Sequence, residues 1–179
     1  MSQRHIEILL GHNLWATRLL LQSSATLDEE QFYHRFDIGP GSLHDTLRHI
    51  IGAMLRWADR IGGRAVAESI ERPGEYCTIA ELDAHLTRAD AALREVAAEL
   101  DAANRWDEKM QFATPDGAVY HFTRAAGMLH VLTHGMHHRA QVLNIRRRLG
   151  LPPFTLDLDV VEWECVQTGQ IDSDERRVG

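Results

Sequence analysis

The chain has 179 residues, a length that suits one domain with a single substantial core. Hydrophobic residues make up 44% of it and charged residues 25%, values that argue against a disordered chain. The formal net charge is −7 and Lys109 is the only lysine, so nucleic-acid binding is disfavoured. The local run of arginines at 146–148 falls at the end of a predicted helix, where cations complement the helix dipole.

The first half of the chain predicts two long helices. Apolar residues recur at helical spacing over about 6–23, and residues 27–32 favour a short helix before the Gly-Pro-Gly break at 39–41. Ser42 is a good N-cap for a helix over about 43–61, which the following Gly-Gly pair ends.

The second half predicts two more long helices with an irregular segment between them. Thr78 and Glu81 have the spacing of a capping box, which begins a helix that continues to about Leu100. Residues 106–122 indicate a small hairpin or irregular loop around a Pro-Asp-Gly turn. The fourth helix is expected over about 123–149, closed by glycine and two prolines.

These elements predict an all-α four-helix bundle with a small hairpin or irregular insertion before the last long helix. Residues 1–170 are expected to form one domain, with a short packed element at 157–167 and a flexible tail at 171–179. The connection between the second and third long helices can cross an end of the bundle, so an up-down-up-down topology is not required.

Targeting and redox features point to the cytoplasm. Cys77 and Cys165 are the two cysteines, and they do not form a C-x-x-C pair, which argues against a disulfide framework and a cysteine-based zinc site. Residues 1–10 lack the apolar run of a signal peptide, and no window approaches about 18 uninterrupted apolar residues. We therefore expect a cytoplasmic protein without a membrane partner.

The most informative motif is a pair of histidines on the fourth helix. His134 and His138 are four residues apart, so they lie one turn apart on one face, where two imidazoles can bind one divalent metal ion. The sector around them is apolar and includes Val131, Val142, Ile145 and Leu149. Histidines on such a face need partners, because an unpaired buried polar group costs about 1–3 kcal/mol. Hydrogen-bonded core histidines and chance pairing among 11 histidines are the alternatives, and we favour metal ligation.

A third ligand is expected from another helix. His130 lies on the same stripe, but it is roughly 12 Å of helix rise from His138, too far for the two to share an ion. The remaining candidates are His12, His44, His49 and His85, with His5, His34 and His121 nearer loops. His49 flanks the apolar seam of the second long helix and is preferred to His44, which belongs to the capped first turn.

Other polar residues have two interpretations each. Gln141 lies near the histidine pair and could orient a bound water or simply pack. His137 is off the centre of the histidine face, and is a partner of the ligands or an exposed residue. Asp45 and Asp59, like Glu7, could shuttle protons, but a solvated surface is the simpler interpretation. Cys77 precedes an N-cap, where the helix terminus can depress a thiol pKa, but a small packing residue is the simpler interpretation.

Several motifs share an order along the chain. They are Asn13-Leu14-Trp15-Ala16, Gly41-Ser42-Leu43-His44, Leu47-Arg48-His49 with Trp57 eight residues later, and His134-x-x-x-His138-Arg139-Ala140-Gln141. In this order they resemble the DinB/YfiT-like metal-binding superfamily of four-helix bundles, the damage-inducible DinB rather than the polymerase of that name. The resemblance covers nearly the whole chain. Ala140 and Thr17 stand where glycine and asparagine are common, and neither departure removes a ligand.

The resemblance implies a metal site made by His49, His134 and His138, with zinc or nickel as the usual occupant and water completing the coordination. Imidazole suits several divalent metals, so ligand chemistry does not decide between them. Some members are S-transferases or isomerases that use bacillithiol, mycothiol or glutathione, with the metal lowering the thiol pKa.

Two functions are therefore expected as alternatives. The first is a metal-dependent thiol S-transferase that acts on small electrophiles in stress or detoxification. The second is a non-catalytic, stress-associated protein with a structural metal site. An open coordination position favours the first, because structural zinc sites normally have four protein ligands. The resemblance also implies a homodimer.

Overall fold

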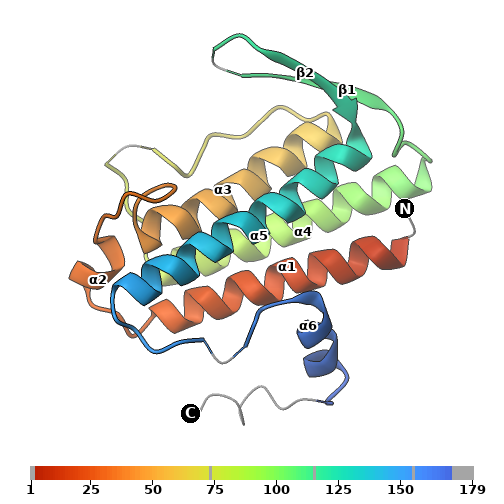
Figure 1. The fold of residues 1–179 in the computed structure, drawn as a ribbon. Coiled ribbons are helices and arrows are strands. Elements are labelled where there is room, and N and C mark those ends of the chain that lie inside the picture. The colour runs from red at the N-terminus through yellow and green to blue at the C-terminus, as the bar shows by residue number, and fades with distance from the viewer. Residues whose placement is uncertain (1–2, 73, 115, 155, 171–179) are drawn as a thin grey trace.

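Four long helices make up the body of the molecule in a computed structural model, which describes residues 3–72, 74–114, 116–154 and 156–170 (Figure 1). They are α1 (Gln3–Ser24), α3 (Leu43–Gly62), α4 (Ile79–Ala102) and α5 (Arg124–Arg148). The shorter elements are α2 (Glu29–Tyr33), α6 (Val160–Gln167) and the strands β1 (Lys109–Ala113) and β2 (Val119–Thr123). The predicted all-α fold with a small hairpin is confirmed, whereas the predicted tail at 171–179 lies outside the described residues.

Local capping explains where the long helices begin. The Ser42 side chain accepts a hydrogen bond from the Asp45 amide at the start of α3, and Thr123 caps α5 in the same way through the Ala126 amide. Thr78 and Glu81 form the predicted capping box of α4. At the other end of α3, Gly63 adopts φ +73°, a left-handed conformation that glycine reaches without strain.

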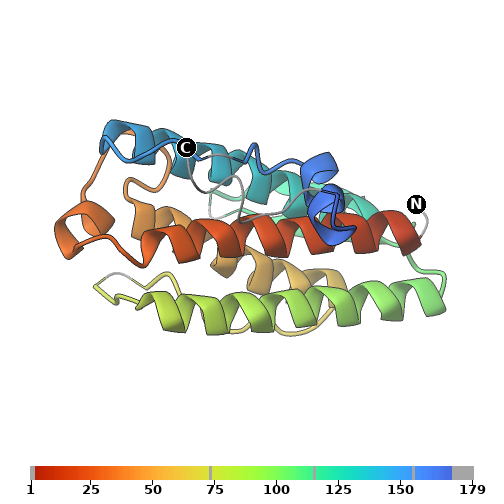
Figure 2. The same ribbon diagram turned by 90° about the horizontal axis from the view of Figure 1, so that it is seen from below.

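The bundle does not alternate in direction. In Figures 1 and 2, α1 and α5 run one way, and α3 and α4 run the other. Each of α3 and α1 packs against both α4 and α5, which makes a ring of four helices. Because α3 and α4 point the same way, the chain after α3 must return along the length of the bundle before α4 can begin (Figure 1). This return segment matters for the site below.

The core is aliphatic, but charged side chains are also buried, and Arg139 is the least exposed of those among the described residues. Fully buried side chains from all four long helices fill it, among them Leu20, Leu47, Ile50, Leu86, Leu93, Met128 and Val142. Arg139 of α5 is only 3% exposed, and its Nη1 donates to Asn13 Oδ1 at 2.6 Å. The buried stripe of α5 passes through Gly135 and Arg139. His134 and His138 therefore lie at the edge of that stripe, half-buried, rather than facing the core directly.

None of the helices among the described residues has the length and apolar character needed to cross a membrane.

Candidate metal centre

Three histidines from two neighbouring antiparallel helices converge. His49 projects from the middle of α3, and His134 and His138 come from successive turns of α5. The Nε2 atom of His134 lies 3.2 Å from His49 Nε2 and 3.1 Å from His138 Nε2. One ligand atom from each side chain lies within 4.8 Å of the others, so the group could hold a metal ion.

Hydrogen bonding alone does not explain this convergence. His49 Nδ1 lies 2.7 Å from Glu71 Oε2, and His138 Nδ1 lies 2.8 Å from Gln141 Oε1. Both acceptors require a proton on Nδ1, which leaves a lone pair on the Nε2 of each imidazole. His134 Nε2 can offer one proton or one lone pair, so it can satisfy at most one of its two close neighbours.

A divalent ion fits all three nitrogens at once. With metal–nitrogen bonds of about 2.0–2.1 Å and tetrahedral angles, two ligand nitrogens lie about 3.3 Å apart. The separations of 3.1 and 3.2 Å around His134 match this value. Within the part of the chain that the structure describes, the group has three members, so water or a substrate would complete a four-coordinate ion.

The surroundings favour the neutral form of the two histidines on α5. Burial, together with the neighbouring imidazoles, lowers the pKa of His134 to about 3. Burial also lowers the pKa of His138, although the bond to Gln141 opposes this effect. Neutral imidazole is the form that binds a metal, so the site is prepared for ligation near neutral pH.

The comparisons with known proteins identify the family of the chain. A family model described as DinB family matches residues 1–173 of the chain. The chain belongs to the DinB family. A search of curated proteins found no match.

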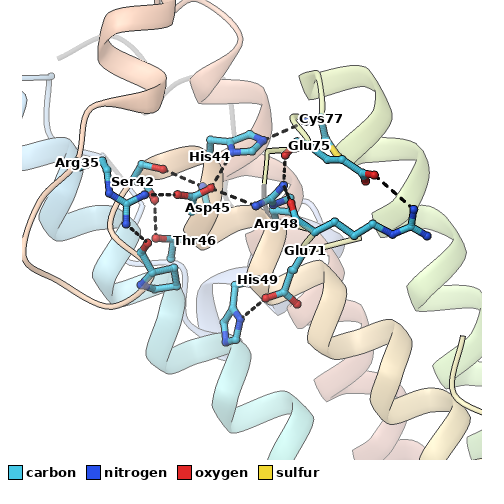
Figure 3. A network of polar contacts seen from close by, with 12 residues as sticks. Arg35, Ser42, His44, Asp45, Thr46, Arg48, His49, Glu71, Glu75 and Cys77 are labelled. Atoms are coloured by element: carbon cyan, nitrogen blue, oxygen red, sulfur yellow. Dashed lines mark hydrogen bonds and ion pairs between the residues drawn. The ribbon is translucent and has the colours of Figure 1, made fainter. Parts of the chain in front are cut away.

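In this DinB-family chain, residues outside α3 and α5 hold two of the histidines in place. Glu71 belongs to the connection between α3 and α4, and its carboxylate contacts His49 (Figure 3). The same carboxylate also accepts from Arg56. Burial alone would raise the pKa of Glu71, but the bonds from His49 and Arg56 lower it below its usual range. Sequence reasoning missed Glu71, because a residue in an aperiodic connection carries no pattern that points to a site.

Gln141 orients His138 rather than pointing away from it. Its Oε1 accepts from His138 Nδ1, and its Nε2 lies 3.2 Å from His137 Nε2. A Cβ at Gly39 would overlap the Gln141 amide, so the predicted Gly-Pro-Gly break also leaves room for this side chain. Gln141 is thus a partner of one ligand histidine, and the exposed His137 is a partner of Gln141.

The other candidate histidines have different partners. His12 Nε2 lies 2.8 Å from the Leu158 carbonyl oxygen, and His44 Nε2 accepts from the Cys77 amide at 3.1 Å. His130 is not part of the three-histidine group, and its ring packs between His134 and Trp57 with centroids 5.5 and 4.7 Å away. His5, His34, His85 and His121 are not in the group either.

Three of the acidic and thiol candidates have structural roles. Asp45 Oδ2 accepts from Arg35 at 2.8 Å, and Asp59 accepts from the Ala67 amide at 2.9 Å. Burial raises the pKa of Cys77, so the depressed thiol pKa considered for a helix terminus is wrong.

An aromatic surface continues from the histidines toward the hairpin. The Trp57 ring lies 5.7 Å from Phe112 and 5.8 Å from Phe122, centroid to centroid, and 4.7 Å from His130. The Arg60 guanidinium lies over Phe112 at 4.8 Å. The cluster of aromatic rings therefore begins at His130, one helical turn from His134.

Proposed function

We propose that this DinB-family protein binds one divalent metal ion per chain through His49, His134 and His138, with zinc or nickel as the occupant. The observation that carries the proposal is the approach of three Nε2 atoms to separations of 3.1 and 3.2 Å around His134. The outer two imidazoles each have a proton acceptor on Nδ1, so their lone pairs are directed to the same point.

Metal analysis of protein purified without a histidine tag tests the proposal. We expect about one zinc or nickel ion per chain in the wild type, and none in a variant with all three histidines changed to alanine. Equal metal content in both proteins would end the proposal. If the His49→Ala variant kept the full metal affinity, His49 would not be a ligand, and the site would consist of the histidine pair on α5.

We further propose that the site is catalytic, and that it transfers a low-molecular-weight thiol to a small electrophile. Three protein ligands leave a position for an exogenous group, as in catalytic rather than structural sites. When bound there, a divalent metal supplies the Lewis acidity that lowers a thiol pKa. The protein would hold a small apolar electrophile against Trp57 and His130, next to His134.

A screen of the metal-loaded protein tests this activity. Bacillithiol, mycothiol and glutathione are each paired with chlorinated and epoxide electrophiles, and His138→Ala is the control. Turnover that needs both a thiol and His138 supports the transferase. Turnover that survives in His138→Ala would contradict it.

The second candidate function is a structural metal site in a non-catalytic protein. It is favoured by the position of the three histidines, because an ion there ties α3 to α5. A large loss of thermal stability on chelation, with no turnover in the screen, would select this alternative.

We also propose a homodimer. Leu129 and Met136 are exposed on α5, seven residues apart, so they share the outer face of the helix that carries two of the histidines. Sedimentation at micromolar concentration should give a dimer, and a monomer would overturn the proposal.

A further inference from the structure

The connection between α3 and α4 is fastened along α3. We call its described residues, 64–72 and 74–78, the strap. Four side chains of α3 hydrogen-bond to the strap, and their order along the helix is the reverse of the order of their partners. Asp59 accepts from the Ala67 amide at 2.9 Å, and Arg56 donates to Ser69 Oγ at 3.0 Å. Arg48 donates to the Arg72 carbonyl at 3.4 Å, and His44 accepts from the Cys77 amide at 3.1 Å. The strap therefore runs antiparallel to α3 along most of its length (Figure 1).

One position on the face of α3 that contacts the strap is a glycine. His44, Arg48 and Arg56 are spaced by multiples of four, and the position between the last two is Gly52. A Cβ at Gly52 would overlap Oε1 of Glu71. The absence of a side chain at this position lets the Glu71 carboxylate lie against α3 and reach His49.

Glu71 uses both of its oxygens. Oε2 lies 2.7 Å from His49 Nδ1, and Oε1 accepts from Arg56 Nη1. The Glu71 and His49 side chains are 22% and 27% exposed, so water competes only partly for this bond. Arg56 also donates to the Ser69 side chain on the same strap, so Arg56 contacts the strap at both the carboxylate and a residue two positions before it.

We propose that Glu71 is a positioning residue for the metal site, and that the strap and Gly52 serve to place its carboxylate on His49. The inference rests on the proposed metal binding and adds to it a residue that does not touch the ion. The carboxylate fixes the Nδ1–H tautomer of His49, aims Nε2 at His134 and makes Nε2 a stronger donor.

The charge balance explains why a carboxylate is needed at His49 when an amide suffices at His138. Three neutral imidazoles bring no negative charge to a divalent ion. The partner of His138 is the neutral amide of Gln141, so Glu71 is the anionic partner within the ligand network. Loss of such an orienting group typically lowers metal affinity by about 10–100-fold.

The test measures zinc dissociation constants by competition with a chelator, and visible spectra of the cobalt-substituted protein, for the full-length chain. We expect Glu71→Ala and Glu71→Gln to bind zinc about 10–100-fold more weakly than the wild type and to alter the cobalt spectrum. Glutamine cannot serve both partners, because its NH₂ group would face a donor on Arg56 or on His49. The matched control is Glu75→Gln, which removes the same charge from an exposed site on the strap and should leave both measurements unchanged.

A double-mutant cycle with Gly52→Ala tests whether the glycine acts through the carboxylate. Gly52→Ala should weaken zinc binding in the wild type and have no further effect in Glu71→Ala. If Glu71→Ala does not fold, Glu71→Gln and Gly52→Ala decide the matter instead. Unchanged zinc affinity and cobalt spectra in the folded Glu71 variants would overturn the inference, while zinc binding by the wild type would still stand. Absence of zinc binding in the wild type would instead overturn the proposed function.

Discussion

At the scale of single residues, the ligand histidines are arranged for an ion. The Nε2 lone pairs of His49 and His138 both approach His134 Nε2, an arrangement that one proton cannot fully satisfy. A bound cation would replace this poor contact with three favourable bonds. Metal binding should therefore be linked to stability, since a ligand that binds only the folded state stabilises it.

We accordingly expect zinc to raise the thermal midpoint of the wild type. At a free concentration a thousand times the dissociation constant, the gain in free energy of unfolding is about 4 kcal/mol. Thermal unfolding with zinc and with a chelator measures this shift. An equal shift in the triple-alanine variant would mean that the zinc acts elsewhere.

His44 gives a prediction that does not involve the metal. Its Nδ1 donates to Asp45 and its Nε2 accepts from the Cys77 amide, and the second bond requires the neutral ring because it uses the Nε2 lone pair. Burial lowers the pKa of His44, and Arg48 assists, although Asp45 acts in the opposite direction. Because the pKa of His44 in the folded state is below the unfolded value of about 6.5, its contribution to the free energy of unfolding is fully present above about pH 6.5. It is lost as the pH falls from there toward the folded-state pKa.

We expect His44→Gln to be less stable than the wild type near pH 7, but to lose less stability between about pH 7 and pH 5. Glutamine keeps an acceptor near the Nε2 position and does not titrate. Urea unfolding across this range measures how the free energy of unfolding changes with pH. The matched control is His121→Gln, at an exposed position on β2. A slope in His44→Gln equal to that of the wild type would show that another group is responsible.

At the scale of elements, the close approach of α1 and α5 depends on a glycine. A Cβ at Gly135 would lie 2.6 Å from Asn13 Oδ1 and 3.0 Å from Arg139 Nη1. These two atoms are hydrogen-bonded to each other, and Arg139 Nη1 also donates to Thr17 Oγ1 at 3.3 Å. The contact holds a guanidinium whose pKa burial lowers to about 10. A side chain at Gly135 would press on Asn13 and on the guanidinium that donates to it.

Gly135→Ala should therefore destabilise the protein by about 1–3 kcal/mol, the usual cost of overpacking a core. Gly127→Ala is the control on the same helix, because its nearest contact would be Ile61 Cγ1 at 3.3 Å. There the gain in helix propensity of about 1 kcal/mol offsets a slight crowding. Chemical unfolding measures both variants, and a Gly135→Ala protein as stable as Gly127→Ala would contradict the packing argument.

At the scale of the whole molecule, we propose that residues 1–170 form a single domain and unfold as one unit. The four long helices share one core, and α6 packs on α1. Three of the four tryptophans lie on separate helices: Trp15 on α1, Trp57 on α3 and Trp163 on α6. Urea unfolding curves from tryptophan fluorescence and from far-ultraviolet circular dichroism should coincide. A fluorescence transition that precedes the loss of helix would indicate an independently unfolding part.

The sequence by itself determined the helices, their caps and the histidine pair on α5. Helical periodicity and the capping residues Ser42, Thr78 and Thr123 act within one or two turns, so a linear pattern is enough to predict them. The same is true of His134 and His138, because a spacing of four residues already fixes their relative position on a helix.

Only the tertiary structure decided which groups surround that pair. Periodicity left His49 and His44 as alternatives and the resemblance pointed to His49, while packing places His49, 85 residues from His134, next to it. The parallel course of α3 and α4 forces the chain back along α3, and this return brings Glu71 to His49. No local rule predicts such a contact, because it depends on the direction and register with which the packed helices meet.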